Sequence, residues 1–152
     1  MKIFLGADHG GFELKTKLFG YLSRNGYDVE DMGNEQFDPQ DDYPQFTQSL
    51  VGKVLGSDDP ETRGILICTG GQGMAIAANR FAGIRASVVW DAHEAKDTRV
   101  DNDSNVLSLP ARIFDDEKEA FGIVETWLST EFSKAPRHIR RLKEIDDFYP
   151  NR

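Results

Sequence analysis

The chain has 152 residues, of which 39% are hydrophobic and 29% charged, the size and balance of one soluble globular domain. Its formal net charge of −8 argues against a nucleic-acid partner, because a phosphate backbone requires a basic surface. No apolar run approaches the ~20 residues of a membrane span, and the start lacks a signal-peptide pattern. The one cysteine excludes an internal disulfide. We therefore expect a cytoplasmic protein without membrane contact.

Strand and helix patterns alternate along the whole chain. The strands are expected at 2–7, 27–33, 64–68, 84–90 and 105–110, and the helices at 11–26, 45–55, 74–83, 92–102, 116–132 and 137–148. The third strand is almost continuously apolar, as buried parallel strands are. Because strands that alternate with helices form βαβ units, we expect an α/β fold whose parallel sheet is covered on both faces.

Polar residues that could take part in catalysis or ligand binding follow the ends of these strands. Parallel sheets bind ligands beyond the carboxyl ends of their strands. The residues that follow strand ends are Asp8 and His9 after the first strand, 68–73 after the third, and Asp91 and His93 after the fourth. Asp101 and Asn102 precede the fifth strand, so they reach the same edge only if the helix before them ends there.

The loop that follows the third strand reads "CTGGQGM". Its glycines let several backbone N–H groups point at one spot, and the next helix adds its positive N-terminus, an arrangement that suits a phosphate or a developing oxyanion. A tight turn with close helix packing explains the same glycines. The loop lacks the Lys-Ser/Thr ending of a Walker loop and the GxGxxG pattern of dinucleotide-binding folds.

Cys68 and Asp8 each admit two interpretations. The Cys68 thiolate is a usable base or nucleophile beside a positive nest, whereas a free cysteine is more commonly a small buried apolar residue. Asp8 could hold a hydroxyl or proton, or cap the following helix. Asp8, His9, His93 and His138 show no recognised ligand spacing, so no metal site is expected.

A basic cluster near the C-terminus contrasts with the acidic remainder of the chain. Within "RHIRR", Arg137 and Arg141 are four residues apart and share one face of a helix. Two guanidinium groups that converge suit a phosphate monoester better than a polymer. A solvated helix face is the alternative.

Taken in order, the segments "ADHGGFELK", "DYP", "ILIC", "GMAIAANRFAGIRAS", "DNDSNVLSLPAR" and "RHIRRL" resemble the type B ribose-5-phosphate isomerases and the lactose-pathway galactose-6-phosphate isomerases. The resemblance covers nearly the whole chain. It implies a Rossmann-like three-layer α/β/α sandwich with a five-stranded parallel sheet, one domain over 1–152. It also implies aldose–ketose isomerisation of a phosphorylated sugar through a cis-enediolate, without cofactor or metal. Such proteins form homodimers or homotetramers with sites shared between subunits, and the helix at about 136–148 is expected to pack on a partner.

The resemblance also assigns site residues. Cys68 matches the cysteine that moves the proton between C1 and C2, and the backbone of Gly71 to Gly73 matches the anion hole for the enediolate oxygen. Gly70 and Gln72 of the same loop are expected among the substrate-binding residues. Asp8 and His9 match a pair that meets the sugar and its phosphate, and Arg137 and Arg141 match phosphate ligands. Tyr43, Asn102 and Arg112 match residues that line the same pocket.

Two departures from the family pattern bear on the substrate. The usual loop reads Cys-Gly-Thr/Ser-Gly-x-Gly, whereas here Thr69 precedes Gly70, so either Thr69 supplies the missing hydroxyl or the loop lacks it. Asp101 stands where many pentose isomerases have the histidine that opens the furanose ring, so Asp101 or His138 opens a ring here, or the substrate has none. Ribose 5-phosphate, a tetrulose 4-phosphate and a hexose 6-phosphate remain candidate substrates.

Two further classes of function remain beside an isomerase. The altered loop is compatible with a module that binds sugar phosphates without turnover. A redox or nucleophilic thiol protein is disfavoured because the sequence has no second, resolving cysteine.

Overall fold

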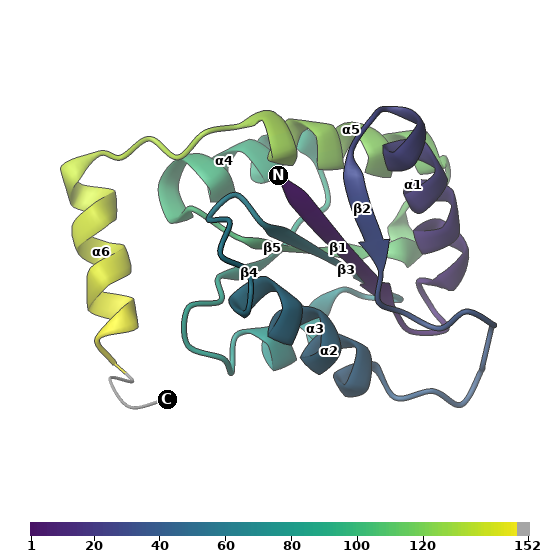
Figure 1. Ribbon diagram of the computed structural model, residues 1–152. Coiled ribbons are helices and arrows are strands. Elements are labelled where there is room, and N and C mark those ends of the chain that lie inside the picture. The colour runs from purple at the N-terminus through teal and green to yellow at the C-terminus, as the bar shows by residue number, and fades with distance from the viewer. Residues whose placement is uncertain (149–152) are drawn as a thin grey trace.

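The computed structural model describes residues 1–148 as five strands and six α-helices that alternate along the chain (Figure 1). The elements are β1 (Lys2–Ala7), α1 (Phe12–Arg24), β2 (Asp28–Asp31), α2 (Tyr43–Leu55), β3 (Arg63–Cys68), α3 (Gln72–Ala78), β4 (Ala86–Val88), α4 (Ala92–Asn102), β5 (Val106–Pro110), a 3₁₀ turn (Ala111–Ile113), α5 (Glu117–Ser129) and α6 (Pro136–Asp146). The predicted α/β fold is confirmed. Of the domain predicted over 1–152, residues 149–152 lie outside the described part.

The five strands form one all-parallel sheet in the order β2-β1-β3-β5-β4. The chain leaves β1 toward β2 on one side and then continues to β3 on the other side, so the order reverses at β1 and β3. Ligands of open parallel sheets bind outside the carboxyl ends of strands at such a reversal. This topology therefore singles out the loops after β1 and β3.

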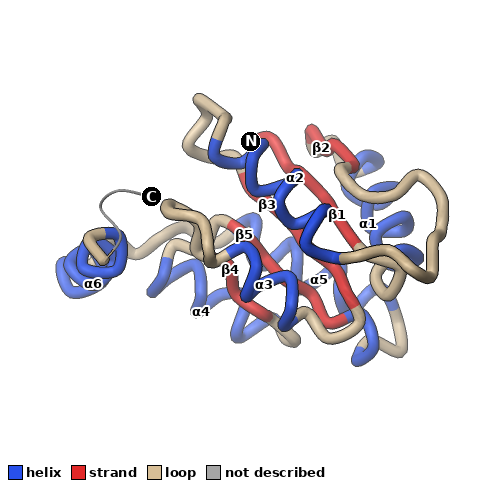
Figure 2. The backbone as a smooth tube through the Cα atoms, turned by 90° about the horizontal axis from the view of Figure 1, so that it is seen from below, coloured by secondary structure: helices blue, strands red, loops and turns tan. Residues whose placement is uncertain are grey.

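Helices cover both faces of the sheet, as Figure 2 shows from below. Alternate strand residues point to opposite faces, so Leu5 and Ile67 pack with α1, α4 and α5, while Phe4 and Leu66 pack with α2 and α3. Trp127 of α5 is fully buried in the first of these two layers. The expected three-layer α/β/α arrangement with a five-stranded parallel sheet is thus confirmed.

The predicted helix at 74–83 and strand at 84–90 are both shorter in the structure. The helix α3 ends at Ala78 because the Asn79 side chain turns to the backbone of Ala86: its Nδ2 donates to the Ala86 carbonyl at 2.8 Å, and its Oδ1 accepts from the Ala86 N–H at 2.8 Å. The backbone of 79–84 forms turns, and Gly83 has a φ of +83°. Only 86–88 remain to pair with β5.

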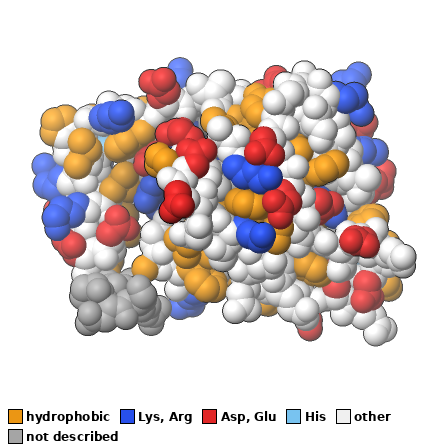
Figure 3. Space-filling model, in the orientation of Figure 1, with side chains coloured by type: hydrophobic (Ala, Val, Ile, Leu, Met, Phe, Trp, Pro, Cys, Tyr) orange, Lys and Arg blue, Asp and Glu red, His pale blue; other side chains and the backbone are white. Residues whose placement is uncertain are grey.

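The last helix stands apart from the sandwich. In Figure 1, α6 projects beside α4 at the end of the extended linker that follows α5. His138 is its one buried side chain among the described residues, whereas Ile139 and Ile145 are each about half exposed. Figure 3 shows basic and apolar side chains together over this helix. Throughout 1–148, no helix combines the length and apolar character needed to cross a bilayer.

Candidate active site

Three loops leave the sheet side by side at its carboxyl edge. Ala7 pairs with Ile67, and Cys68 pairs with Pro110, so the segments after β1, β3 and β5 begin at neighbouring positions. A Cβ at Gly10 would overlap the Thr69 hydroxyl, which shows that the first loop lies directly on the second. The third is tied on by the Arg112 N–H, which donates to the Thr69 carbonyl at 3.1 Å.

Cys68 ends β3 and is 6% exposed. The backbone N–H of Gly71 donates to its sulfur at 3.1 Å, and the Ser108 hydroxyl donates to the Gly71 carbonyl at 2.6 Å. Gly71 itself has a φ of +71°, a left-handed conformation that favours glycine. The loop therefore holds a fixed N–H donor against the sulfur, which stabilises negative charge that develops there.

The remaining loop residues approach two predicted pocket residues. A Cβ at Gly73 would come within 2.8 Å of the Tyr43 ring, so only glycine allows this tyrosine to lie over the loop. The Arg112 guanidinium lies beside Gly70, 3.8 Å from the position of a Cβ there. A groove of about 310 Å³ lies alongside and includes Thr69 and Arg112 in its lining. The structure thus places Tyr43 and Arg112, which the family resemblance assigns to one pocket, against the Cys68 loop.

Asp8 and His9 stand at the end of β1, next to this loop. Asp8 is buried, its Oδ1 accepts a hydrogen bond from the Gly11 N–H at 3.2 Å, and burial raises the pKa of its carboxyl group. His9 is partly exposed, and its Nδ1 lies 2.7 Å from Oδ1 of Asp41. That hydrogen bond is the main cause that raises the pKa of His9. The sequence analysis missed Asp41, although an acid-rich loop directly before Tyr43-Pro44 was a usable signal.

Asp101 and Asn102 lie at the opposite edge of the sheet. The helix α4 begins after β4 at the carboxyl edge and runs back, so its last residues reach the amino ends of the strands. The Asn102 carbonyl accepts from Arg85 Nε at 3.1 Å, just before β4 begins. The helix therefore does not end at the carboxyl edge of the sheet, and Asp101 and Asn102 do not reach Cys68 of the same chain.

His138 connects α6 to α4 and is only 3% exposed. Its Nε2 accepts from Arg137 Nε at 2.7 Å, and its Nδ1 lies 2.9 Å from the Ser133 hydroxyl and 3.5 Å from Oδ1 of Asp101. Both ring nitrogens are thus engaged, and the ring helps to hold the side chains of Arg137 and Asp101 in position. Arg137 and Arg141 themselves are exposed on α6.

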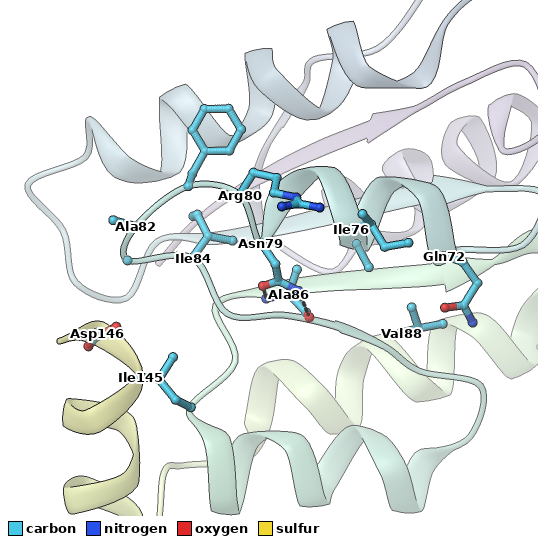
Figure 4. Close-up of a pocket in the computed structure, with 13 residues that line it drawn as sticks. Gln72, Ile76, Asn79, Arg80, Ala82, Ile84, Ala86, Val88, Ile145 and Asp146 are labelled. Carbon is cyan, nitrogen blue, oxygen red and sulfur yellow. Dashed lines mark hydrogen bonds between the residues drawn. The ribbon is translucent and has the colours of Figure 1, made fainter. Parts of the chain in front are cut away.

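A separate pocket of about 510 Å³ lies between α3, β4 and the end of α6 (Figure 4). Ile76 and Val88 project into it from the sandwich, and Ile145 faces them from α6. Of the predicted site residues, Gln72 reaches its rim. Among residues 1–148, no group of three or more His, Cys, Asp or Glu side chains gathers where it could hold a metal ion.

Comparison with known proteins identifies the family of the chain. The family model for the ribose/galactose isomerases matches residues 3–145. A ribose-5-phosphate isomerase B from Mycolicibacterium paratuberculosis is 34% identical over 148 residues, which are 97% of this chain and 91% of that protein. The crystal structure of a ribose 5-phosphate isomerase from Thermotoga maritima has a TM-score of 0.90 at 41% identity and covers 96% of this chain and 97% of its own. That of ribose-5-phosphate isomerase B from Mycoplasma genitalium, with bound ribulose 5-phosphate, has a TM-score of 0.91 at 35% identity, covering 99% and 97%. A match of this extent means that the chain belongs to the ribose/galactose isomerase family.

Proposed function

We propose that the chain interconverts ribose 5-phosphate and ribulose 5-phosphate through a cis-enediolate, with Cys68 as the group that carries the proton. The observation that supports this most directly is the Cys68 sulfur beside the Gly71 N–H, at the edge of the sheet that also carries Asp8, His9 and Arg112. The relative from Mycoplasma genitalium was solved with the ketose of this pair.

The reaction needs a base and an oxyanion site at once, because a proton on a carbon next to a carbonyl group is weakly acidic. The Cys68 thiolate removes the proton from C2, the C–H electron pair forms the C1–C2 double bond, and O1 becomes an oxyanion. The backbone N–H groups of residues 70–73 stabilise that charge. We assign to the exposed Thr69 hydroxyl the movement of a proton from O2 to O1. The thiol then returns its proton to C1, which leaves the ketone at C2.

Asp8 and His9 hold the substrate in this scheme. The buried Asp8 accepts a hydrogen bond from a sugar hydroxyl, while His9 and Arg112 supply positive charge toward the phosphate. Phosphate binding at a distance from the reacting carbons positions those carbons against the sulfur. Tyr43 closes one side of the loop and excludes water from it.

A second copy of the chain completes the site in this proposal. Arg137, Arg141, Asp101 and Asn102 lie at the amino edge or on α6, away from Cys68 of the same chain. In a two-fold symmetric dimer, the same surface of each copy meets the other, so one partner can bring these residues to the Cys68 edge of its mate. The projecting α6, with Ile139 and Ile145 half exposed, provides apolar area for such an interface.

A tetrose 4-phosphate is the second candidate substrate. A pentose 5-phosphate closes a furanose ring through its 4-hydroxyl, whereas a tetrose 4-phosphate has that oxygen esterified and stays open. Both nitrogens of the buried His138 are engaged, which leaves Asp101 as the ring-opening candidate. An open-chain substrate needs no such group, so the tetrose is the alternative substrate if Asp101 does not open a ring.

One assay in ²H₂O tests the proposal. The purified chain is incubated with ribose 5-phosphate, erythrose 4-phosphate or a hexose 6-phosphate. Both the ketose product and the deuterium at C2 of the recovered aldose are measured. Turnover of any of them with solvent exchange at C2 supports an enediolate isomerase, and the fastest identifies the substrate. Saturable binding without product or exchange, at any enzyme concentration, would instead identify a non-catalytic sugar-phosphate binding module.

A further inference from the structure

The loop between β2 and α2 presents a carboxylate to His9. Oδ1 of Asp41 accepts hydrogen bonds from both the His9 backbone N–H, at 3.1 Å, and the ring Nδ1, at 2.7 Å. The Asp41 side chain is 5% exposed, while that of His9 is 41% exposed. One nitrogen of a solvent-accessible ring is therefore held by a buried acid.

Asp41 is itself fixed by a chain of contacts that starts in the core. Its Oδ2 accepts from Asn34 Nδ2 at 2.8 Å, and the Asn34 carbonyl accepts from Lys15 Nζ at 2.9 Å. Lys15 is 1% exposed on the inner side of α1, and its Nζ also lies 2.6 Å from Oδ2 of Asp31. A buried lysine thus anchors the loop that places Asp41, so the carboxylate is held in position before any ligand arrives.

We propose that Asp41 is a positioning residue that holds His9 as an imidazolium, with Nδ1–H directed to the carboxylate and Nε2–H directed outward to the phosphate of the substrate. This rests on the proposed function. The structure gives Nε2 no hydrogen-bond partner within residues 1–148. A neutral ring that keeps Nδ1–H on Asp41 would present the lone pair of Nε2 to the phosphate and repel it. The second ring proton, which Asp41 stabilises, therefore decides whether His9 attracts or repels the ligand.

The charges around His9 support this assignment. The hydrogen bond from Asp41 raises the pKa of His9 most, burial opposes it, and the charges of Asp41, Asp8 and Asp38 raise it further. Asp38 belongs to the same loop as Asp41, and Asp8 follows the end of β1. Of these three carboxylates, Asp41 alone forms a hydrogen bond with the ring.

The test replaces Asp41 by Asn in the full-length protein, with Asp38→Asn as the matched control that removes the same charge from the same loop. The His9 ring is titrated by NMR, and kcat and KM are measured from pH 5.5 to 8.5. In Asp41→Asn we expect the His9 titration to move to lower pH and KM to rise roughly tenfold at pH 8, with kcat changed less than about twofold. The rise in KM should shrink toward pH 5.5, where the variant ring is protonated as well, and Asp41→Glu should recover most of the affinity.

Two results would overturn the inference. One is a His9 titration that is unchanged in Asp41→Asn or that moves as much in Asp38→Asn. The other is a KM that rises equally at pH 5.5 and pH 8, which is the result of a merely structural role. If the wild-type chain turns over no sugar phosphate, the proposed function fails. The NMR titration with inorganic phosphate still tests whether Asp41 holds His9 as a phosphate-binding imidazolium. Phosphate should shift the His9 ring of wild type and of Asp38→Asn, and shift that of Asp41→Asn far less at pH 8.

Discussion

The Gly71 backbone N–H donates a hydrogen bond to the Cys68 sulfur at 3.1 Å, and the Ser108 hydroxyl fixes the same peptide region through the Gly71 carbonyl. This hydrogen bond connects the glycine turn of the "CTGGQG" loop to the cysteine at the start of the loop. The tight-turn interpretation and the functional interpretation of the glycines are therefore compatible. The turn is tight, and it aims a donor at the one thiol of the chain.

Cys68→Ala should lower kcat by about 10³-fold while ligand affinity changes less than about threefold, because a positioned base contributes 10²–10⁴ and the phosphate ligands remain. Binding of ribulose 5-phosphate by calorimetry and turnover by a coupled assay separate the two effects. Cys68→Ser is the matched variant, since it keeps the shape but replaces the thiol by a much weaker acid. An equal loss of affinity and turnover in both variants would contradict the role as proton carrier.

The fold was largely accessible from sequence because its signals are local. The helix Ala92–Asn102 matches the prediction residue for residue, and the apolar run of 64–68 predicts a central strand. The strand at 84–90 was over-extended because the side chain of Asn79, which ends α3 and pairs with Ala86, gives no periodic signal. An amphipathic pattern likewise predicts a solvent-exposed Lys15. In the structure Lys15 is buried, because its ammonium group donates hydrogen bonds to the Asp31 carboxylate and the Asn34 carbonyl.

The candidate site was accessible only in part. Cys68, Asp8 and His9 follow strand ends, and parallel topology alone brings strand ends together. The opposite position of Asn102 follows from the same topology, since a helix after β4 must run back before β5 begins. Asp41 could not be found this way because a 32-residue separation from His9 in the sequence is bridged only by the folded loop.

Asp8→Asn should stabilise the protein and reduce its activity. Burial raises the pKa of this carboxyl group, so ionisation at neutral pH costs folding free energy that an amide does not, while the amide oxygen still accepts from Gly11. A raised folded-state pKa means that the wild type gains stability as the pH falls through this pKa. The Tm of Asp8→Asn should therefore exceed that of wild type by about 1–2 °C at pH 7 and converge with it at acidic pH. A lower Tm at pH 7 would contradict the prediction.

Gly10→Ala should destabilise the fold by roughly 1–3 kcal/mol, because its Cβ would overlap the Thr69 hydroxyl and force the loops after β1 and β3 apart. Gly122→Ala is the control, since a Cβ there meets nothing within 4 Å and lies in the helix α5, where alanine is favoured by about 0.5–1 kcal/mol. Urea unfolding of both variants measures the difference. Gly10→Ala as stable as wild type would show that the loops are not packed as described.

Asp101→His should shift the substrate preference from erythrose 4-phosphate toward ribose 5-phosphate by about tenfold or more, if a ring-opening acid–base group is what the chain lacks. The ratio of kcat/KM for the two sugars is the measurement. Asp97→His is the matched control, since Asp97 lies one turn earlier on α4 and is similarly exposed, at 54% against 51% for Asp101. A wild type that already favours ribose 5-phosphate by a wide margin removes the tetrose alternative.

The separation of Cys68 from Arg141 within one chain predicts complementation between inactive variants. Neither Cys68→Ala nor Arg141→Ala alone should be active, but if each site takes Cys68 from one copy and Arg141 from the other, a mixed dimer contains one intact site. An equimolar mixture, unfolded and refolded together, should recover about one quarter of wild-type activity, since about half of the dimers are mixed and each has one of its two sites intact. A mixture of Cys68→Ala with Cys68→Ser is the control and should recover nothing. If the first mixture stays as inactive as the control, while size-exclusion chromatography shows dimers, the two residues do not meet across a subunit interface, and the phosphate must be held by His9 and Arg112 alone.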